Sequence, residues 1–379
     1  MSAATRLVVI HPGDGSWGSD SVLLRTAEVL REMNPDAQLE LWHEESNVDR
    51  NFLLRFPGDA RRIRTLVLRR RNLNTFRAVA MLMLPFYLVA DVRRMRDVRQ
   101  VFINTCVPFS ALIAAGITRR DGWVHVHEIP QHRFEQIIFS LVVAFSGLRP
   151  LYISDAVRLA FRRSLGGRLS NRLDGPVVLN GVDPAPFVPA PIDDDPEGPL
   201  SILCLGRFSS WKGQDVLLDA LALLDEHQVP YDVRLVGLTT AADFEYLELL
   251  RVKQAALQGR VEFIAYTDRV HDHYEWSDVV VVPSTRPEPF GLSAAEGALM
   301  GRPVIASSHG GLVEIVRPGI TGALIPPGDP AALADVLLTY AKDRMLLIEH
   351  GNEAQRHAES EFGHDAFADR MRNAIRTAS

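Results

Sequence analysis

The second half of the sequence carries two pairs of charged residues whose types and spacing could bind a ligand. Arg207 and Lys212 lie in the stretch "GRFSSWKG", and Lys212 is one of only three lysines in the chain. Two fixed cations beside glycines suit a diphosphate, because charge-assisted hydrogen bonds contribute roughly 1.5–3 kcal/mol each. The alternative is a pair of solvated loop cations. Glu288 and Glu296 form the second pair, in "EPFGLSAAE".

The elements around the glutamates favour a binding site. Val279–Val282 is short, β-branched and continuously apolar, which is typical of a parallel strand covered on both faces. Pro283 ends this strand, and Ser293–Met300 is predicted to be a helix. Glu288 therefore falls in the loop at the strand's carboxyl end, and Glu296 about one turn into the helix. In open α/β sheets ligands bind at such loops, where helix N-termini and free N–H groups converge.

Length and composition limit the class of protein. A chain of 379 residues that is 47% hydrophobic can form two domains with substantial cores. The formal net charge of −6 argues against nucleic-acid binding as the main task. Cys106 and Cys204 have no metal-ligand spacing and are expected to be reduced core residues of a cytoplasmic protein. The N-terminus enters a strand without a basic and then apolar leader, so export by that route is not expected.

Strands alternate with helical patterns along the chain, which predicts βαβ units and an α/β fold. The proline- and acid-rich stretch 184–199 is predicted to be a linker. It separates an N-terminal domain, 1–183, from a C-terminal domain, 200–360. Residues 361–379 are predicted to form a C-terminal helix that packs back towards the N-terminal domain.

The positive charge of the first half of the chain is concentrated in residues 61–100. This segment has eleven arginines and two aspartates, a local excess of nine positive charges, and it contains the apolar run Ala78–Ala90. Thirteen residues are too few to cross a bilayer, which needs about 20. Two interpretations stay open. The segment could rest on an anionic membrane surface, where each Lys or Arg contributes about 1 kcal/mol, or it could be a core helix with solvated arginines at its ends.

Five motifs in order resemble those of one family, the retaining nucleotide-sugar glycosyltransferases of family 4 (group 1). "GRFSSWKG" resembles its diphosphate motif, and "EPFGLSAAE" matches its paired-glutamate motif. "NGVD" at 180–183, "HGGLVEIV" at 309–316 and "GITGALIPPGDPAAL" from 319 resemble three further elements. The resemblance spans nearly the whole chain. It implies the GT-B fold, in which two Rossmann-like β/α/β domains face each other across a cleft.

The resemblance also implies roles for residues of the second half. Arg207 and Lys212 should bind the diphosphate of the donor, Glu288 should contact the transferred sugar, and Glu296 should hold the ribose hydroxyls. A carboxylate suits both tasks because it can accept hydrogen bonds from two vicinal hydroxyls. The remaining donor-binding residues are expected from backbone groups: Phe290, Gly291 and Leu292 at the helix start, and Tyr266 and Thr267 against the base.

The first half should supply the acceptor side. "WVHVHEIP" resembles a strand end of the family, and His127 falls where the family places a histidine near the donor sugar. His125 alternates with it on the same strand, so both should point to one face. The N-terminal loop departs from the family, which has adjacent glycines before a glutamate. Gly15 and Gly18 are the candidates for bringing N–H groups to the diphosphate.

The predicted reaction transfers a hexose-type sugar from a UDP or GDP donor to an acceptor hydroxyl. By resemblance it retains the anomeric configuration, and it needs neither a metal nor another cofactor. The acceptor would be a glycan, a lipid-linked precursor or a small molecule in cell-surface polysaccharide or glycolipid synthesis, with the enzyme cytoplasmic or peripheral on the inner face of the plasma membrane. Alternatives are a GT-B nucleotide-sugar epimerase, a glycosyltransferase for a soluble secondary metabolite, and a non-catalytic nucleotide-sugar binder.

Overall fold

The chain forms two compact units in the computed structural model. The structure describes residues 6–13, 18–44, 50–67, 76–182, 191–192, 195, 197–238, 243–267 and 269–377. Unit 1 consists of Met1–Gly181 together with Phe367–Ser379, and unit 2 of Val182–Ala366. Most of the predicted linker, 184–199, lies outside the described residues.

Unit 1 is built on a parallel sheet whose described strands follow the order β3-β2-β1-β4-β5-β6. The central strands are continuously apolar because helices cover both faces. The strands are β1 (Arg6–His11), β2 (Gln38–Glu44), β3 (Asp59–Ile63), β4 (Gln100–Asn104), β5 (Asp121–Val126) and β6 (Arg149–Tyr152).

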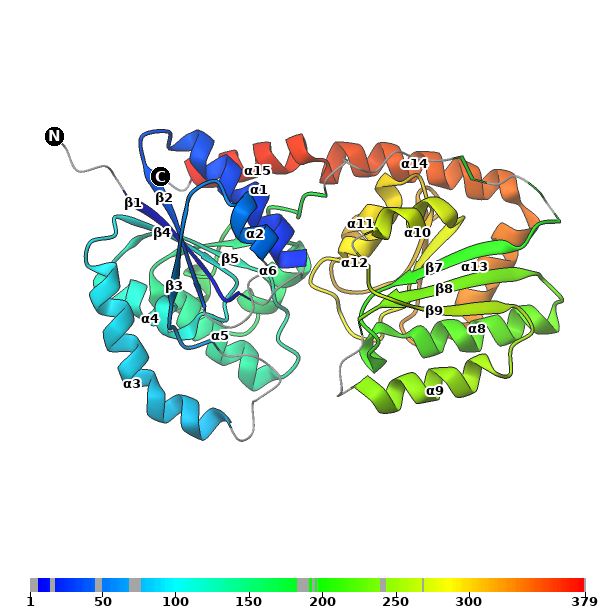
Figure 1. The fold of residues 1–379 in the computed structure, drawn as a ribbon, viewed down its shortest axis with the longest axis horizontal. Coiled ribbons are helices and arrows are strands. Elements are labelled where there is room, and N and C mark those ends of the chain that lie inside the picture. The colour runs from blue at the N-terminus through cyan, green and yellow to red at the C-terminus, as the bar shows by residue number, and fades with distance from the viewer. Residues whose placement is uncertain are drawn as a thin grey trace. The chain divides into compact units, whose positions relative to one another are not determined.

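Two layers of helices cover this sheet (Figure 1). One layer contributes its buried side chains to a core with the strands, and it includes α1 (Gly18–Met33), α2 (Arg50–Arg55) and α15 (His364–Thr377). The other layer contains α3 (Phe76–Met95), which packs on α4 (Phe109–Thr118), which in turn packs on α5 (Arg133–Ser146). The short helices α6 (Asp155–Arg162) and α7 (Gly167–Asn171) follow β6.

The C-terminal helix α15 belongs to the core of unit 1. Phe367, Met371 and Ile375 are buried there with side chains of β1 and α1. Phe367 also explains the glycine of the "NGVD" stretch, because a Cβ on Gly181 would lie 2.7 Å from the Cβ of Phe367. The sequence segments 6–181 and 367–377 therefore build one hydrophobic core.

Unit 2 repeats the same parallel architecture. Its described strands follow the order β12-β11-β10-β7-β8-β9, so β7 and β10 are the central neighbours, as β1 and β4 are in unit 1. This pair marks the topological switch point, where open α/β sheets bind ligands outside the carboxyl ends of the strands. The strands are β7 (Leu200–Leu205), β8 (Tyr231–Gly237), β9 (Arg260–Ala265), β10 (Val279–Val282), β11 (Val304–Ser307) and β12 (Gly322–Ile325).

Helices again cover both faces of the sheet of unit 2 (Figure 1). α8 (Gln214–Glu226), α9 (Phe244–Gln254) and α13 (Pro330–Lys342) form one core with the strands. α11 (Leu292–Leu299) packs on β10 and on α14 (Arg344–Phe362). The remaining helices are η2 (Ser210–Lys212), α10 (Val270–Trp276) and α12 (Leu312–Ile315).

Candidate functional site

The loops that follow β7 and β10 are joined to each other at the switch point of unit 2. The Thr285 N–H donates to the Trp211 carbonyl at 2.8 Å, and its hydroxyl donates to the Ser210 carbonyl at 3.3 Å. Gly213, which precedes α8, has a φ of 72°, and a Cβ there would lie 2.0 Å from the Pro283 carbonyl oxygen. The glycine thus permits the close approach that unites the two predicted motifs in one site.

Lys212 and Glu288 meet directly in this site. The ammonium Nζ lies 2.8 Å from Glu288 Oε1, and both side chains are largely buried. Ser284 also donates its hydroxyl to Glu288 Oε1, while the Lys212 ammonium sits 4.5 Å from the centre of the Trp211 ring. Such a buried charge pair persists because each charge compensates the other. Sequence reasoning missed Trp211, which lies inside "GRFSSWKG", and Ser284, which lies four residues before Glu288.

Arg207 lies at the start of the same loop and is more accessible. Its side chain is 35% exposed, and its Nε lies 4.0 Å from Asp243 Oδ2. The Arg207 carbonyl accepts a hydrogen bond from Gln214 Nε2 at 3.0 Å, and Gln214 is buried at the beginning of α8. This bond fixes the backbone from which the guanidinium projects.

Two glycines after β11 hold the backbone of Glu288. Gly310 has a φ of 62°, and a Cβ there would lie 2.4 Å from the Glu288 carbonyl oxygen. That same oxygen accepts a hydrogen bond from the Gly311 N–H at 2.8 Å. The "HGG" stretch therefore contributes backbone support to the glutamate loop rather than side chains.

The helix after Glu288 begins one residue earlier than predicted. α11 spans Leu292–Leu299 rather than Ser293–Met300, because Gly291 adopts a left-handed φ of 112° and already serves as its N-cap. Phe290 is buried just before this cap. The N-terminus of α11, whose first N–H groups carry a partial positive charge, thus directly follows the loop that carries Glu288.

Glu296 lies on α11 and contacts a tyrosine from α10. The Tyr274 hydroxyl donates to Glu296 Oε2 at 2.8 Å, and sequence reasoning had not identified Tyr274. The predicted base-binding residues Tyr266 and Thr267 follow β9, at the same carboxyl edge of the sheet. The Tyr266 N–H donates to the Gly237 carbonyl at 3.0 Å.

Histidines gather at the carboxyl edge of the sheet of unit 1. The His127 ring Nε2 lies 3.1 Å from His125 Nδ1, so the two rings share one face as their alternation predicts. Burial lowers the pKa of His125 to about 3. Burial, and then the neighbouring His125 and His11, lower the pKa of His127 well below its ordinary value. Both imidazoles are therefore neutral at physiological pH.

A third histidine sits at the end of β1 in a separate set of contacts. His11 Nε2 lies 3.1 Å from Asp20 Oδ1, and His11 Nδ1 lies 3.0 Å from Asn104 Nδ2 at the end of β4. Gly18 is the first residue of α1. Gly15 lies outside the described residues, so of the two predicted loop glycines only Gly18 is placed, at a helix start two residues before Asp20.

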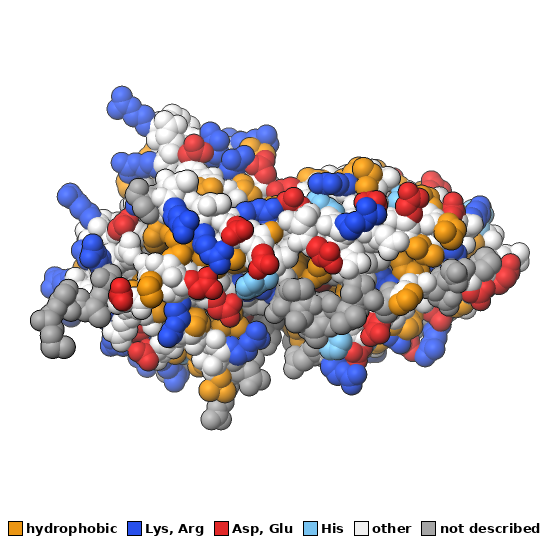
Figure 2. All heavy atoms as spheres, turned by 90° about the horizontal axis from the view of Figure 1, so that it is seen from above, with side chains coloured by type: hydrophobic (Ala, Val, Ile, Leu, Met, Phe, Trp, Pro, Cys, Tyr) orange, Lys and Arg blue, Asp and Glu red, His pale blue; other side chains and the backbone are white. Residues whose placement is uncertain are grey.

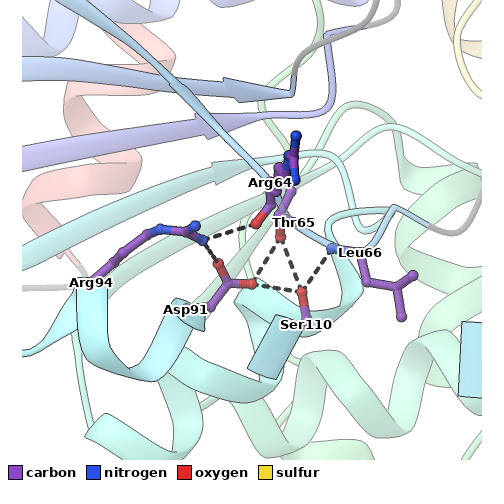
Figure 3. A network of polar contacts seen from close by, with 6 residues as sticks. All are labelled: Arg64, Thr65, Leu66, Asp91, Arg94 and Ser110. Atoms are coloured by element: carbon purple, nitrogen blue, oxygen red, sulfur yellow. Dashed lines mark hydrogen bonds and ion pairs between the residues drawn. The ribbon is translucent and has the colours of Figure 1, made fainter. Parts of the chain in front are cut away.

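The basic segment 61–100 is anchored through α3. Asp91 accepts hydrogen bonds from Thr65 and Ser110, at 2.9 and 2.6 Å, and pairs with Arg94 at 2.8 Å (Figure 3). The Arg94 guanidinium also donates to the Arg64 carbonyl. Asp91 is buried, which raises its pKa. This network fixes the inner side of α3 against α4.

The outer side of α3 is apolar and exposed. Leu82 and Phe86 are 74% and 71% exposed, and Val89 follows one turn later on the same stripe. Arg93 continues the stripe, and Arg61 and Arg62 are exposed on the edge strand β3. Arg69, Arg70 and Arg71 lie outside the described residues. No helix in the described part of the chain combines the length and apolar character needed to span a membrane.

The described residues show neither a candidate metal cluster nor, on the face drawn in Figure 2, a surface dominated by one sign of charge. Among the described residues, no group of three or more His, Cys, Asp or Glu is arranged to hold a metal ion. On the face shown in Figure 2, acidic and basic side chains are interspersed over both units. Cys106 and Cys204 are both buried, as predicted for core cysteines, and no disulfide joins them.

Comparison with known protein families finds a match in the C-terminal part of the chain. Residues 199–343 match the family described as Glycosyl transferases group 1, which confirms the resemblance predicted from the motifs there. A D-inositol 3-phosphate glycosyltransferase from Streptomyces avermitilis is 38% identical over 182 residues, which cover 46% of this chain and 39% of that protein. The lipopolysaccharide core biosynthesis mannosyltransferase LpcC from Rhizobium leguminosarum bv. viciae is 29% identical over 194 residues, covering 49% and 55%. The matches thus span only about half the length of these relatives.

Solved structures resemble the chain over nearly its whole length. The crystal structure of Anabaena Alr3699/HepE in complex with UDP and glucose has a TM-score of 0.79 and 22% identity, covering 98% of this chain and 100% of that one. A sucrose-phosphate synthase from Thermosynechococcus elongatus has a TM-score of 0.76 and 20% identity, covering 98% of both chains. At this identity the likeness establishes the fold, and the predicted GT-B architecture of two Rossmann-like domains is confirmed.

Proposed function

We propose that this chain, whose residues 199–343 match the family Glycosyl transferases group 1, transfers a hexose-type sugar from a nucleoside diphosphate-sugar to an acceptor hydroxyl. The observation that carries the proposal is the joining of the two motif loops in unit 2. It places Lys212 and Glu288 2.8 Å apart, and Glu288 precedes the first residue of α11 by four positions. An ammonium next to a carboxylate at a helix start offers one partner to a phosphate and another to a sugar hydroxyl.

The proposed chemistry follows from charge that develops on the leaving group. The bond between the anomeric carbon and the diphosphate oxygen breaks, and a bond to the acceptor oxygen forms. Arg207, Lys212 and the α11 N-terminus stabilise the negative charge that grows on the diphosphate. The acceptor proton passes to the departing phosphate, on the same face, so the anomeric configuration is retained. Protein cations thus take the task that a metal performs elsewhere.

The Lys212–Glu288 pair is compatible with a bound donor. An ammonium has three N–H donors, so Lys212 can keep its contact with Glu288 while it donates to a phosphate oxygen. Glu288 in turn accepts from Ser284 and Lys212 on Oε1, which orients the carboxylate towards a sugar hydroxyl. His127, whose pKa burial holds well below its ordinary value, is proposed to offer a hydrogen bond to the sugar as a neutral imidazole.

UDP and GDP are the proposed nucleotides of the donor. The crystal structure of the similar HepE protein contains UDP and glucose, which supports a uridine donor and a hexose. Glu296 would hold the ribose hydroxyls, and the backbone at Tyr266 and Thr267 would lie against the base. Because these contacts bind the nucleotide, the choice of sugar would depend on Glu288 and the residues around it.

The experiment that tests the function is a binding and product assay on the full chain. UDP, GDP, ADP and their sugars are screened by thermal shift, since a ligand at 100 times its dissociation constant adds about 2.7 kcal/mol of stability. The stabilising sugar nucleotide is then incubated alone and with acceptors, and the products are identified by NMR. Release of a glycoside or of sugar with retained configuration is expected. A free epimer would instead indicate an epimerase, and binding without any hydrolysis would indicate a non-catalytic binder.

The acceptor side is proposed to work at an anionic membrane surface, on the inner face of the plasma membrane. The stripe formed by Leu82, Phe86 and Val89 has an exposed apolar side, while the buried Asp91 network holds the helix in place. Exposed arginines flank it on β3 and at the end of α3. Apolar side chains flanked by cations are suited to the boundary between acyl chains and anionic headgroups.

Vesicle sedimentation tests this surface. Wild-type protein should bind phosphatidylglycerol-containing vesicles at low salt and be released as salt screens the charges. Leu82→Gln together with Phe86→Gln should weaken binding by about tenfold or more, because each loses an apolar side chain worth about 1.5–3 kcal/mol when buried. The matched control is Phe244→Gln with Val252→Gln on α9, where two apolar side chains are similarly exposed. If wild-type protein ignores these vesicles at low salt, a soluble acceptor becomes the better proposal.

A further inference from the structure

We propose that Tyr274 is a positioning residue that fixes the carboxylate of Glu296 for the ribose hydroxyls of the donor nucleotide. The inference rests on the proposed function and adds to it the residue that orients this carboxylate. Tyr274 comes from α10, outside both motif loops, and its hydroxyl lies 2.8 Å from Glu296 Oε2.

The contact between Tyr274 and Glu296 is made by a side chain of the protein interior. Tyr274 is fully buried, whereas Glu296 is only half-buried on α11. The same hydroxyl lies 3.3 Å from the Ser293 carbonyl, in the first turn of α11. The phenol thus contacts both the carboxylate and the helix that carries it, so the position of Glu296 follows that of Tyr274.

A buried arginine holds Tyr274 from the other side. Arg302 is 1% exposed. Its Nε donates to the Tyr274 carbonyl at 3.0 Å, and its Nη2 donates to the Glu275 carbonyl at 3.0 Å. Both carbonyls lie in the last turn of α10, where a cation also interacts favourably with the helix dipole. Backbone and side chain of Tyr274 are therefore fixed independently of any ligand.

The chemistry of the pair suits a receptor for a diol. Burial, and next the charge of Glu296, raise the pKa of Tyr274 well above its ordinary value, so the phenol stays protonated and donates. A hydrogen bond to an ionised acceptor is stronger than one between neutral groups. Donation to Oε2 stops rotation of the carboxylate, and a carboxylate with a fixed plane loses less entropy when it accepts from two vicinal hydroxyls.

The test separates this role from a purely structural one. Tyr274→Phe removes only the hydroxyl. The matched control is Tyr340→Phe, which removes another buried hydroxyl of unit 2, bonded at 2.8 Å to His350 Nδ1 between α13 and α14. Calorimetry on the full chain then compares UDP with 2′,3′-dideoxy-UDP, or the guanine pair if the protein binds GDP instead. A structural defect would weaken both nucleotides alike.

We expect wild-type protein to prefer the ribose form, and Tyr274→Phe to reduce that preference about three- to tenfold by weakening only the ribose form. Tyr340→Phe should leave the preference unchanged, and Glu296→Ala should abolish it. If Tyr274→Phe keeps the wild-type preference while Glu296→Ala loses it, the role of Tyr274 is overturned and the proposed function stands. If Glu296→Ala keeps the preference, or no nucleotide binds, the proposed site itself fails and this inference with it.

Discussion

The two sheets share one strand order but have different chemistry at their carboxyl edges. In unit 2 the loops after β7 and β10 carry a cation and a carboxylate that meet at 2.8 Å. In unit 1 the ends of β1, β4 and β5 carry His11, Asn104 and His127, and burial keeps the pKa of His127 low. The same topology therefore presents a cation paired with a carboxylate in unit 2 and the neutral His127 imidazole in unit 1.

The difference indicates a division of labour. A diphosphate is stabilised by cations and helix N-termini, so the charged edge of unit 2 suits the nucleotide. A neutral imidazole can donate one hydrogen bond and accept another, which suits an uncharged sugar hydroxyl or acceptor hydroxyl. Unit 2 also relies on backbone contacts at Gly213 and Gly310, where a side chain would not fit. The following predictions test this contrast, from the largest effect to the smallest.

Removing the cations of unit 2 should have the largest effect. Arg207→Ala and Lys212→Ala should each lower donor turnover by at least about tenfold, because each variant loses a transition-state contact worth about 1.5–3 kcal/mol. The double variant should be lower by about a hundredfold, measured by release of nucleoside diphosphate. Lys253→Ala serves as control, since Lys253 pairs with Asp219 between α9 and α8. Wild-type turnover in the double variant would refute the assignment of the diphosphate site.

A methyl group at Gly310 should disturb the glutamate loop. Gly310→Ala places a Cβ against the Glu288 backbone, whereas Gly319→Ala, at a similar positive φ of 74°, meets nothing within 4 Å. Gly310→Ala should therefore lower the free energy of unfolding by about 1–3 kcal/mol more than Gly319→Ala, and it alone should reduce donor turnover. Urea denaturation and turnover measure the two effects. Equal effects of the two substitutions would show that the glutamate loop does not depend on this contact.

The histidines of unit 1 should make the protein less stable in acid. In the folded state the pKa of His125 is lowered to about 3, so below pH 6.5 the unfolded state binds the proton first. The free energy of unfolding should then fall as pH falls from about 6.5 towards 3, by up to about 1.4 kcal/mol per pH unit for this group. His125→Asn should flatten the dependence of the urea midpoint on pH, whereas His227→Asn, on the exposed end of α8, should not. An unchanged slope in His125→Asn would contradict a neutral buried His125.

Chelation should have the smallest effect. Because Arg207 and Lys212 are proposed to neutralise the leaving group, EDTA should leave donor turnover essentially unchanged. Added magnesium or manganese should not restore the Lys212→Ala variant. Strict dependence of the wild-type rate on either metal would show that Arg207 and Lys212 do not neutralise the leaving group by themselves. The contrast drawn between the two sheet edges would then fail.

Prediction from the sequence was most accurate where a clear pattern of residue types lies next to a family motif. Val279–Val282 is a strand as predicted, and the helix predicted after it, Ser293–Met300, differs from α11 (Leu292–Leu299) by one residue at each end. The weak strands escaped detection. β3 has the sequence Asp59-Ala60-Arg61-Arg62-Ile63 and is exposed along most of its length, so its pairing with β2 at the sheet edge leaves no apolar pattern to find.

Contacts between distant segments could not be predicted in the same way. The link between Tyr274 and Glu296 joins residues 22 positions apart on two helices, and neither periodicity nor spacing fixes that approach. The Lys212–Glu288 pair spans 76 positions. The family motifs named both residues, but their loops are brought together by tertiary contacts, the approach of Gly213 to Pro283 and the hydrogen bond from Thr285 to Trp211. Local sequence therefore identified the groups, and tertiary packing determined which of them meet.

The return of the chain to unit 1 has a consequence for folding during synthesis. Residues from Phe367 to Ile375 complete a core otherwise built before Gly181. A ribosome adds roughly 5–20 residues per second, so the earlier part of unit 1 waits about 10–40 seconds before α15 emerges. During that interval unit 2 can close on itself, since Val182–Ala366 is continuous. The unit that begins first would then be the last to be completed, with its apolar surface under α15 available to chaperones in the meantime.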